Sequence, residues 1–243
     1  QLFRRKVKFL GHVLTDKGVH PQHIKCKAVQ DWPEPRNAQQ VRQFLGLVGY
    51  YRKYIKDYAD KARPLFDCLK GDNFDNFEFT DKVKKSFLDL KESLATPPLL
   101  LLPDQKQADN GSQPYLLVTD ASQVAVGGVL MQDQGNGYQP VAYESKALSP
   151  AEQNYNTTER ELLAIVHCTK VWKHYLQGSH YKLQSDHKPL EAFFSPNKDL
   201  TRRQARWIEH LVEVGVQNME HVPGRTIPVP DSLSRRPGYV ETS

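Results

Sequence analysis

The 243-residue sequence predicts an α/β (α+β) protein: a mixed five-stranded sheet with flanking helices, preceded by a mainly helical segment. From residue 114 onward, three strand-like stretches follow one another, and then helix, strand, helix, strand and a short terminal helix or turn. This order is typical of a mixed sheet and not of an all-β or helix-bundle protein. The hydrophobic fraction of 39% and charged fraction of 25% exclude a collagen-like, coiled-coil or wholly disordered chain.

The first 102 residues contain two amphipathic patterns. Residues 7–19, VKFLGHVLTDKGV, predict two short strands around a turn. Asn37, with Gln40 three residues later, predicts a helix N-cap and its reciprocal partner. Helical spacing then joins Val41, Phe44, Leu45 and Val48. A second helix is predicted over 81–95, with one apolar face made of Val83, Phe87, Leu90 and Leu94.

Residues 103–113, PDQKQADNGSQ, are polar and rich in turn formers, and we interpret them as a domain linker. Three strands are predicted after this linker, in the segments YLLVTDAS, VAVGGVLMQ and QPVAYESKAL, with a hairpin turn at 133–137. A capping box formed by Ser149 and Glu152 predicts a long helix that continues to about Leu176.

The fourth strand is predicted in HYKLQSD, and the fifth in VQNMEHV. Between them, Thr201 and Gln204 form another capping box. This capping box predicts the start of a helix. The side chains of that helix expected to face the core are Trp207, Ile208, Leu211 and Val212. A short terminal helix or turn is expected to start in 230–234.

Positive charge is concentrated at the start of the chain. Residues 1–60 contain twelve Lys or Arg and five Asp or Glu, a charge of +7, whereas the whole chain carries +5 and the remainder therefore −2. This asymmetry favours a first part that contacts a polyanion and a later part that holds acidic chemistry. A solvated basic face without a partner has the same composition.

Three other features bound the class of protein. The cysteines at positions 26, 68 and 168 are widely spaced, which favours free thiols over a disulfide framework or a zinc site. No apolar run approaches the ~20 residues that a membrane helix needs. The sequence has no initial Met, and we expect it to be a piece of a longer protein.

Four acidic residues stand at predicted element ends. Asp120 ends the first strand, Glu161 lies early in the long helix, Asp186 ends the fourth strand and Asp231 starts the terminal element. Singly, each is typical of a turn, a cap or a solvated helix face. As a set they predict a cluster, in which the carboxylates repel one another unless a cation lies among them. Oxygen ligands favour Mg²⁺ or Mn²⁺ over zinc, and two such ions support phosphodiester hydrolysis.

The sequence resembles the ribonuclease H domain of gypsy-type LTR retrotransposon Pol polyproteins. The matching sequence segments are LLVTDAS (116–122), YNTTERELLAIV (155–166), SDHKPL (185–190), RW (206–207) and HVPG…PDSLSR (221–235). The upstream part of the chain resembles the reverse transcriptase of the same polyproteins. The matching segments are FLGHVLTDKGV (9–19), WPEP (32–35), VRQFLGLVGYYRKYI (41–55) and RPLFDCLK (63–70).

The resemblance implies a domain order. It divides the chain into the end of the reverse transcriptase palm with a primer-grip-like hairpin (1–20), thumb and connection (21–102), linker (103–113), ribonuclease H domain (114–236) and tail (237–243). The Tyr-x-Asp-Asp polymerase motif is absent from the sequence, so this fragment alone is not expected to polymerise DNA. The parent polyprotein is expected to be an RNA-directed DNA polymerase, a nucleotidyltransferase.

The resemblance also implies site residues. The catalytic and metal-binding set is Asp120, Glu161, Asp186 and Asp231, with Glu159 as second choice for the glutamate. His221 matches a catalytic-loop histidine, although a strand-end histidine without a role is an equal alternative. His187 is expected to be a supporting or surface residue. The sequence departs from the family at Ile227, where Asn is usual, and at Pro230, where Ala is commoner.

The implied activity is divalent-metal-dependent endonuclease cleavage of the RNA strand of RNA–DNA hybrids, with two Mg²⁺ or Mn²⁺ ions. The implied partners are the hybrid and the rest of the Pol polyprotein, including reverse transcriptase palm and fingers and integrase, with no membrane. The expected location is intracellular, in a cytoplasmic virus-like particle or the nucleus. Nucleic-acid contacts are expected from Arg52, Lys53, Lys56, Arg202 and Arg203.

Three alternatives remain open at this stage. Tyr50, Tyr51 and Tyr54 are expected either to pack in the core or to stack on the hybrid. The chain as a whole is either a nuclease or a catalytically inactive, host-adopted remnant that only binds nucleic acid. An integrase-like strand-transfer domain is disfavoured, because the helix containing Glu161 follows three strands directly and no His/Cys zinc-binding extension is present.

Overall fold

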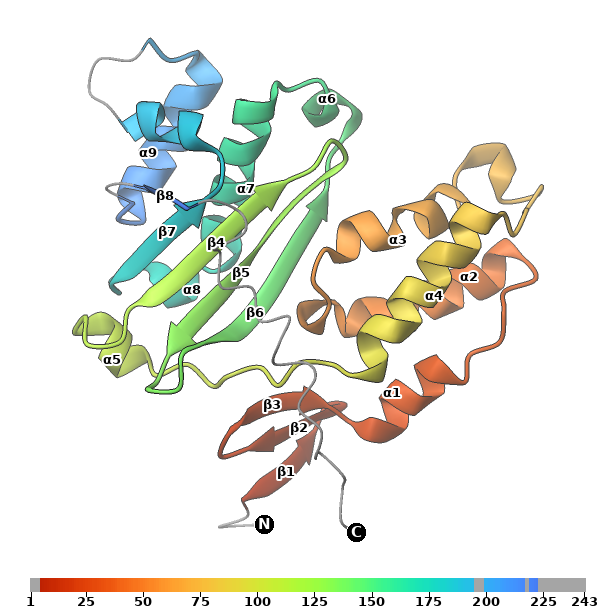
Figure 1. Ribbon diagram of the computed structural model, residues 1–243. Coiled ribbons are helices and arrows are strands. Elements are labelled where there is room, and N and C mark those ends of the chain that lie inside the picture. Colours follow the sequence, from red (N-terminus) through yellow and green to blue (C-terminus); the bar gives the residue numbers. More distant parts are fainter. Residues whose placement is uncertain (1–4, 195–198, 217–218, 223–243) are drawn as a thin grey trace. The chain divides into compact units, whose positions relative to one another are not determined.

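The computed structural model describes residues 5–194, 199–216 and 219–222 (Figure 1). Backbone packing divides these residues into two units. The first comprises residues 5–55 and 61–102, and the second comprises 56–60 and the described residues from 103 to 222. The five-residue segment 56–60 thus belongs to a unit whose remainder begins much later in the sequence.

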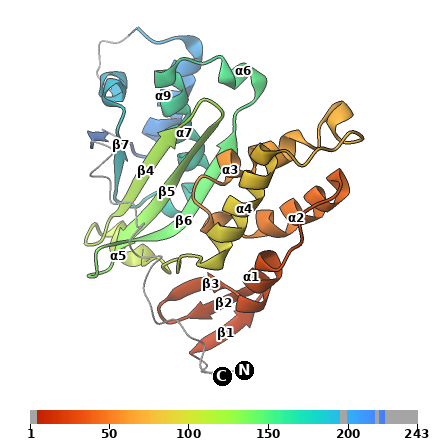
Figure 2. The same cartoon turned by 45° about the vertical axis from the view of Figure 1, so that its right-hand side comes forward.

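The first unit combines a three-stranded antiparallel sheet with helices. Its elements are β1 (Lys6–Phe9), β2 (His12–Thr15), β3 (Gly18–Pro21), α1 (His23–Gln30), α2 (Ala38–Tyr50), η1 (Arg52–Tyr54), η2 (Gly71–Asn73), α4 (Asp81–Ala95) and most of α3 (Tyr58–Asp67). Figure 2 shows β1, β2 and β3 in their order beside α1.

The sheet of the first unit has one strand more than predicted. The segment 7–19 contains a second turn, at 16–17, after which β3 pairs with β2 in the register His12↔Pro21 to Thr15↔Gly18. Gly18 makes this turn with a φ of +148°, and a Cβ at this position would lie 2.3 Å from the carbonyl oxygen of Leu100. Only glycine fits such a close backbone approach. Two short strands are therefore replaced by three.

The two predicted helices of this unit are confirmed. Asn37 caps α2 by accepting a hydrogen bond from the Gln40 backbone N–H at 2.9 Å. The Gln40 side chain accepts from the Arg36 N–H at 2.7 Å, one residue before the expected partner. The buried side chains of α2 and α4 meet at Phe44 and Phe87, whose ring centroids lie 4.6 Å apart.

The three tyrosines at positions 50, 51 and 54 have different surroundings. Tyr51 and Tyr54 are each 2% exposed and pack in the core. Tyr50 is 52% exposed and stacks on the His12 ring at 5.4 Å. The sequence left open whether these tyrosines pack in the core or stack on the hybrid. Tyr51 and Tyr54 pack in the core.

The second unit contains a five-stranded sheet in the order β6-β5-β4-β7-β8. Its elements are α5 (Gln105–Asp109), β4 (Tyr115–Ala121), β5 (Ala125–Asp133), β6 (Tyr138–Ala147), α6 (Pro150–Gln153), α7 (Thr157–Val171), α8 (Lys173–Leu176), β7 (Tyr181–Ser185), η3 (Lys188–Phe194), α9 (Arg202–Glu213) and β8 (Glu220–His221). Strands β4, β5 and β6 are antiparallel neighbours, whereas β7 runs parallel to both β4 and β8. This is the mixed sheet that the sequence predicts.

Helix α7 packs on β4 and β5, and α9 packs on α7 (Figure 1). Close approach of α7 depends on Gly128 of β5. A Cβ at Gly128 would lie 2.5 Å from the Val118 carbonyl oxygen and 3.0 Å from Sγ of Cys168 on α7. Because so many α7 side chains are buried, from Leu162 to Val166 and on to Thr169, the helix is fixed against the sheet.

Two features of this unit differ from the prediction. The interpreted linker, 103–113, includes α5, and the backbone of Asp104 is bound to the fully buried Gln132 by hydrogen bonds of 2.8 and 3.0 Å. The predicted long helix is three helices. Asn156 caps α7 by accepting from the Glu159 N–H at 2.9 Å, and Trp172 separates α7 from α8.

The face of α9 also needs one correction. Leu211 is fully buried, and Trp207 and Ile208 are partly buried, but Val212 is 67% exposed and does not point inward. The capping box between Thr201 and Gln204 is present as predicted. No helix in the described part of the chain combines the length and apolarity needed to cross a membrane.

Candidate metal-binding site

Asp120 and Asp186 lie at the same edge of the sheet. Asp120 is near the carboxyl end of β4, and Asp186 directly follows β7. The two strands are parallel neighbours, with Val118 opposite Gln184. Continuing this register by two residues brings Asp186 beside Asp120, because the carboxyl ends of parallel strands meet at one edge. Both side chains are exposed.

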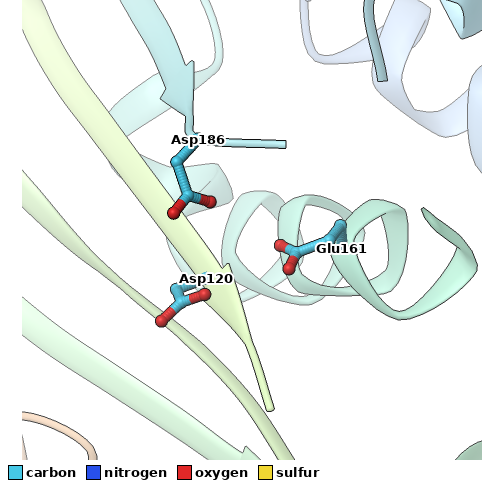
Figure 3. A group of neighbouring side chains, drawn as sticks. All are labelled: Asp120, Glu161 and Asp186. Atoms are coloured by element: carbon cyan, nitrogen blue, oxygen red, sulfur yellow. The ribbon is translucent and has the colours of Figure 1, made fainter. Parts of the chain in front are cut away.

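Glu161 completes the group from the helix that covers the sheet. It lies in the second turn of α7 and is 5% exposed. Figure 3 shows the three carboxyl groups turned toward one another from β4, α7 and the end of β7. One oxygen of each carboxyl group lies within 4.8 Å of the others. Residues far apart in sequence are thus brought to one place.

The site is electrostatically unfavourable without a cation. Burial, followed by the negative charges of Asp120 and Asp186, raises the pKa of the Glu161 carboxyl to about 8. Oε2 of Glu161 is buried, and it has no hydrogen-bond partner among the described residues. A buried acceptor without a donor costs free energy, and a cation between the carboxylates would remove that cost. The donor set therefore fits a hard divalent metal ion.

Glu159, the second choice for the glutamate, does not belong to this group. Its Oε1 accepts from Nη2 of Arg203 at 2.7 Å and from Nε2 of Gln204 at 3.3 Å. The Arg203 guanidinium also lies over the Tyr155 ring, 3.9 Å from its centroid. Glu159 therefore joins α7 to α9, and Glu161 is the glutamate that faces the aspartates.

The two predicted histidines flank Asp186. Nε2 of His187 lies 2.9 Å from Oγ1 of Thr158, which links the end of β7 to the start of α7. Nε2 of His221, on β8, lies 3.1 Å from the backbone oxygen of Asp186. His187 is thus hydrogen-bonded beside the site, and its supporting role, like a role for His221 in proton transfer, stays a prediction.

Asp231, the fourth predicted acid, lies outside the described residues, as do Ile227 and Pro230. The predicted nucleic-acid contacts fall on both units. Arg52, Lys56 and Arg202 are exposed, Lys53 is partly buried against the Tyr54 ring, and Arg203 is bound to Glu159. Their contact with nucleic acid remains a prediction.

Sequence reasoning missed one neighbour of the site. Asp60, in the segment 56–60, accepts a hydrogen bond at 2.8 Å from Oγ of Ser122, two residues after Asp120. Ser122 was part of a motif, but nothing in the sequence joins it to Asp60, because they are 62 residues apart.

Comparison with known proteins shows what this chain is similar to. Residues 110–214 match the sequence model of the RNase H-like domain found in reverse transcriptase. Over 94% of this chain, the fold matches the foamy viral protease-reverse transcriptase dRH in complex with double-stranded DNA, with a TM-score of 0.70 and 19% identity, covering 39% of that chain. The same viral protein in complex with an RNA/DNA hybrid matches with a TM-score of 0.68 and 18% identity, over 99% of this chain and 31% of that one.

The fold and the family match define an RNase H-like domain of the reverse-transcriptase type. The Pol polyproteins of transposon 297 and transposon gypsy from Drosophila melanogaster are 37% and 35% identical, each over 97% of this chain. The Tf2-3 polyprotein of Schizosaccharomyces pombe is 34% identical, also over 97%. The chain spans 17–23% of the length of these relatives. It belongs to the reverse transcriptase–ribonuclease H region of retrotransposon Pol polyproteins.

Proposed function

We propose that the chain is a divalent-metal-dependent endonuclease that hydrolyses the RNA strand of RNA–DNA hybrids. The observation that carries the proposal is the group formed by Asp120, Glu161 and Asp186, with ligand oxygens within 4.8 Å of one another and an unpartnered buried oxygen on Glu161. The family supports the choice of nuclease chemistry, since residues 110–214 match an RNase H-like domain of reverse transcriptases.

The three carboxylates would hold the metal, and Asp231 would complete a second ion position. Mg²⁺ or Mn²⁺ suits an all-oxygen donor set. When bound, two such ions activate a water molecule and stabilise the leaving oxygen. Glu161 has to release its proton to become a ligand, because its pKa lies near 8 without the metal. Metal binding therefore displaces this proton, and the affinity rises with pH.

The remaining side chains would orient the group and the substrate. The strand ends fix Asp120 and Asp186, while α7 delivers Glu161 from the opposite side (Figure 3). His221, held at the Asp186 backbone, would assist proton transfer or product release. Water breaks the bond between phosphorus and the 3′ oxygen of the RNA strand, leaving a 3′-hydroxyl and a 5′-phosphate. The exposed basic residues would contact the phosphates of the hybrid.

The test uses the whole chain, Mg²⁺ and a hybrid with labelled RNA. Asp120→Asn is expected to reduce cleavage by about 1,000-fold or more while the circular dichroism spectrum is unchanged, because one ligand charge is lost. Asp133→Asn is the matched control, since Asp133 ends β5 at the hairpin and an amide oxygen can still accept from the Gly135 and Gly137 N–H groups. Full cleavage by Asp120→Asn would contradict the proposal. Hybrid binding by the wild-type chain without products would favour the inactive remnant instead.

A further inference from the structure

A cavity next to Asp120 is lined partly by residues from the early segment 56–60. Its lining includes Asp57, Asp60, Asp120, Ser122, Gly127 and Ser145. The segment 56–60 belongs to the second unit, although the rest of that unit begins at residue 103. The wall of the cavity on this side therefore comes from outside the stretch that the sequence predicts as the ribonuclease H domain.

Two hydrogen bonds join this segment to the sheet. Oγ of Ser122 donates to Oδ1 of Asp60 at 2.8 Å, and the backbone N–H of Ala59 donates to Oγ of Ser145 at 2.7 Å. Ser145 lies on β6 and pairs with Gly127 of β5. The segment is thus attached both to the β4–β5 turn and to the adjacent strand.

Ser122 organises the turn that follows Asp120. Its Oγ accepts hydrogen bonds from the N–H groups of Val124 at 3.1 Å and of Ala125 at 2.9 Å. Its own N–H donates to the Ala125 carbonyl at 2.8 Å. A hydroxyl has one proton and two lone pairs, so these two amides use its acceptor capacity. Its proton has two acceptors in reach: the Asp60 carboxylate at 2.8 Å and the Ala125 carbonyl at 3.2 Å.

The carboxylate is the nearer acceptor and it is charged, which makes it the stronger one. Donation to Asp60 holds the hydroxyl in the rotamer whose lone pairs face the two amides. Without Asp60, the hydroxyl proton would turn to Ala125, and the turn would lose its tie to the segment 56–60. Asp120, two residues before Ser122, is the ligand whose backbone this turn restrains.

We propose that Asp60 is a positioning residue for the carboxylate site: through Ser122 it fixes the turn that begins next to Asp120. Asp60 is then a functional residue of the RNase H-like unit, supplied by a stretch of chain before residue 61. This inference rests on the proposed metal-dependent function, since the property that Asp60 controls is the geometry of a metal ligand.

The experiment measures the Kd of Mn²⁺ for the whole chain by titration calorimetry, at a temperature well below the melting temperature of every variant. Asp60→Ala is expected to raise the Kd by about three- to tenfold, at or below the low end for residues that orient metal ligands. Asp60→Asn is expected to stay within about twofold of wild type, because its amide oxygen accepts the same hydrogen bond. Ser122→Ala is expected to match Asp60→Ala, and the double variant to add nothing further.

Asp57→Asn is the charge control. Asp57 lines the same cavity and has a φ of +56°, a conformation that Asn tolerates well. It should leave the Kd unchanged. A melting temperature lowered by Asp60→Ala with an unchanged Kd would reduce Asp60 to a structural residue and overturn the proposal. Equal losses in Asp60→Asn and Asp60→Ala would overturn the hydrogen-bond mechanism in favour of charge.

Hybrid cleavage, measured in parallel, separates this inference from the proposed function. A wild-type chain that binds Mn²⁺ but does not cleave would refute the nuclease, while the comparison of Kd values would still decide the role of Asp60. A wild-type chain that binds no Mn²⁺ would overturn both.

Discussion

Helix α7 contains two buried glutamates in successive turns, and their surroundings are opposite in charge. Glu159 is 7% exposed and bonded to Arg203 and Gln204 of α9. Glu161 is 5% exposed and faces Asp120 and Asp186, with one oxygen unpartnered within the described structure. The same type of side chain thus forms an ion pair at position 159 and faces like charges at position 161.

This difference implies that Glu159 stabilises the folded state, whereas Glu161 in its charged form destabilises it. Glu159 has its counter-charge within the protein, so its removal should weaken the fold. Glu161 faces two aspartates, whose charges and the burial of the carboxyl outweigh the positive charge of Arg160. An acid that destabilises the fold in its charged form is typical of a site that awaits a ligand. The direction of the stability change on mutation is therefore expected to be opposite for the two residues.

The largest expected effect is on metal binding. Glu161→Gln keeps the volume of the side chain but removes the charge, and it should weaken Mn²⁺ binding by more than about 100-fold, the upper end for residues that only support ligands. Hybrid cleavage should disappear with it. Glu159→Gln should leave the Kd for Mn²⁺ within about threefold of wild type. Titration calorimetry on both variants makes the comparison, and the reverse ranking would assign the ligand to Glu159.

The next effect is a dependence of stability on pH. The pKa of Glu161 is raised to about 8 in the folded chain, against an ordinary value of 4.5. Between these values the folded state keeps a proton that the unfolded state has released, so the free energy of unfolding falls as pH rises from about 4.5 to 8. Below that range the penalty is absent, and above it the penalty is complete. Each pKa unit corresponds to about 1.4 kcal/mol, which makes the whole effect a few kcal/mol.

Urea denaturation of the metal-free chain at pH 5, 7 and 8.5 measures this slope. Glu161→Gln should flatten it and should be more stable than wild type at pH 8.5, since an amide has no charge to bury. Saturating Mg²⁺ should also flatten it, because the ion takes the place of the proton. Equal slopes in wild type and Glu161→Gln would show that the carboxyl titrates normally.

Much of the fold was predictable because its signals are local. The capping boxes at Ser149 and Thr201 and the helix at 81–95 depend on residues three or four positions apart, and all three are confirmed. The break between α6 and α7 was missed, although Asn156 is a good N-cap, because the capping box at Ser149 was taken as the start of one helix that continues to Leu176. The third strand was missed because its sequence, GVHP, has no alternating apolar pattern, and part of its pairing is with Leu100, far along the chain.

The site was predictable to the extent that strand ends can be located from sequence. Asp120 and Asp186 follow strand patterns, but their adjacency depends on β7 running parallel to β4, which no local pattern encodes. The choice of Glu161 over Glu159 came from the resemblance, and Arg203 supplies the physical reason for it. The tie between Asp60 and Ser122 had no signal, since a single contact over 62 residues leaves no periodicity.

The smallest expected effect tests the stabilising side of the comparison. Arg203→Ala leaves Glu159 buried, with Gln204 as its remaining side-chain partner among the described residues, and removes the stacking on Tyr155. Breaking a fully buried ion pair costs about 3–5 kcal/mol, and the Arg203 side chain is 43% exposed, so we expect a loss of about 2 kcal/mol in urea denaturation. The double variant with Glu159→Gln should recover part of this loss, because it removes the charge left unpaired.

Arg202→Ala is the matched control on the same helix. Arg202 is exposed, and its replacement should change the free energy of unfolding by less than about 0.5 kcal/mol. If Arg202 contacts a phosphate of the hybrid, its replacement should lower the slope of log affinity against log salt concentration by about one. The Arg203 guanidinium is bound to Glu159. Arg203→Ala should therefore lower the free energy of unfolding and leave the salt dependence of hybrid binding nearly unchanged. If Arg203→Ala has wild-type stability and a smaller slope of log affinity against log salt concentration, Arg203 contacts nucleic acid and Glu159 has no structural role.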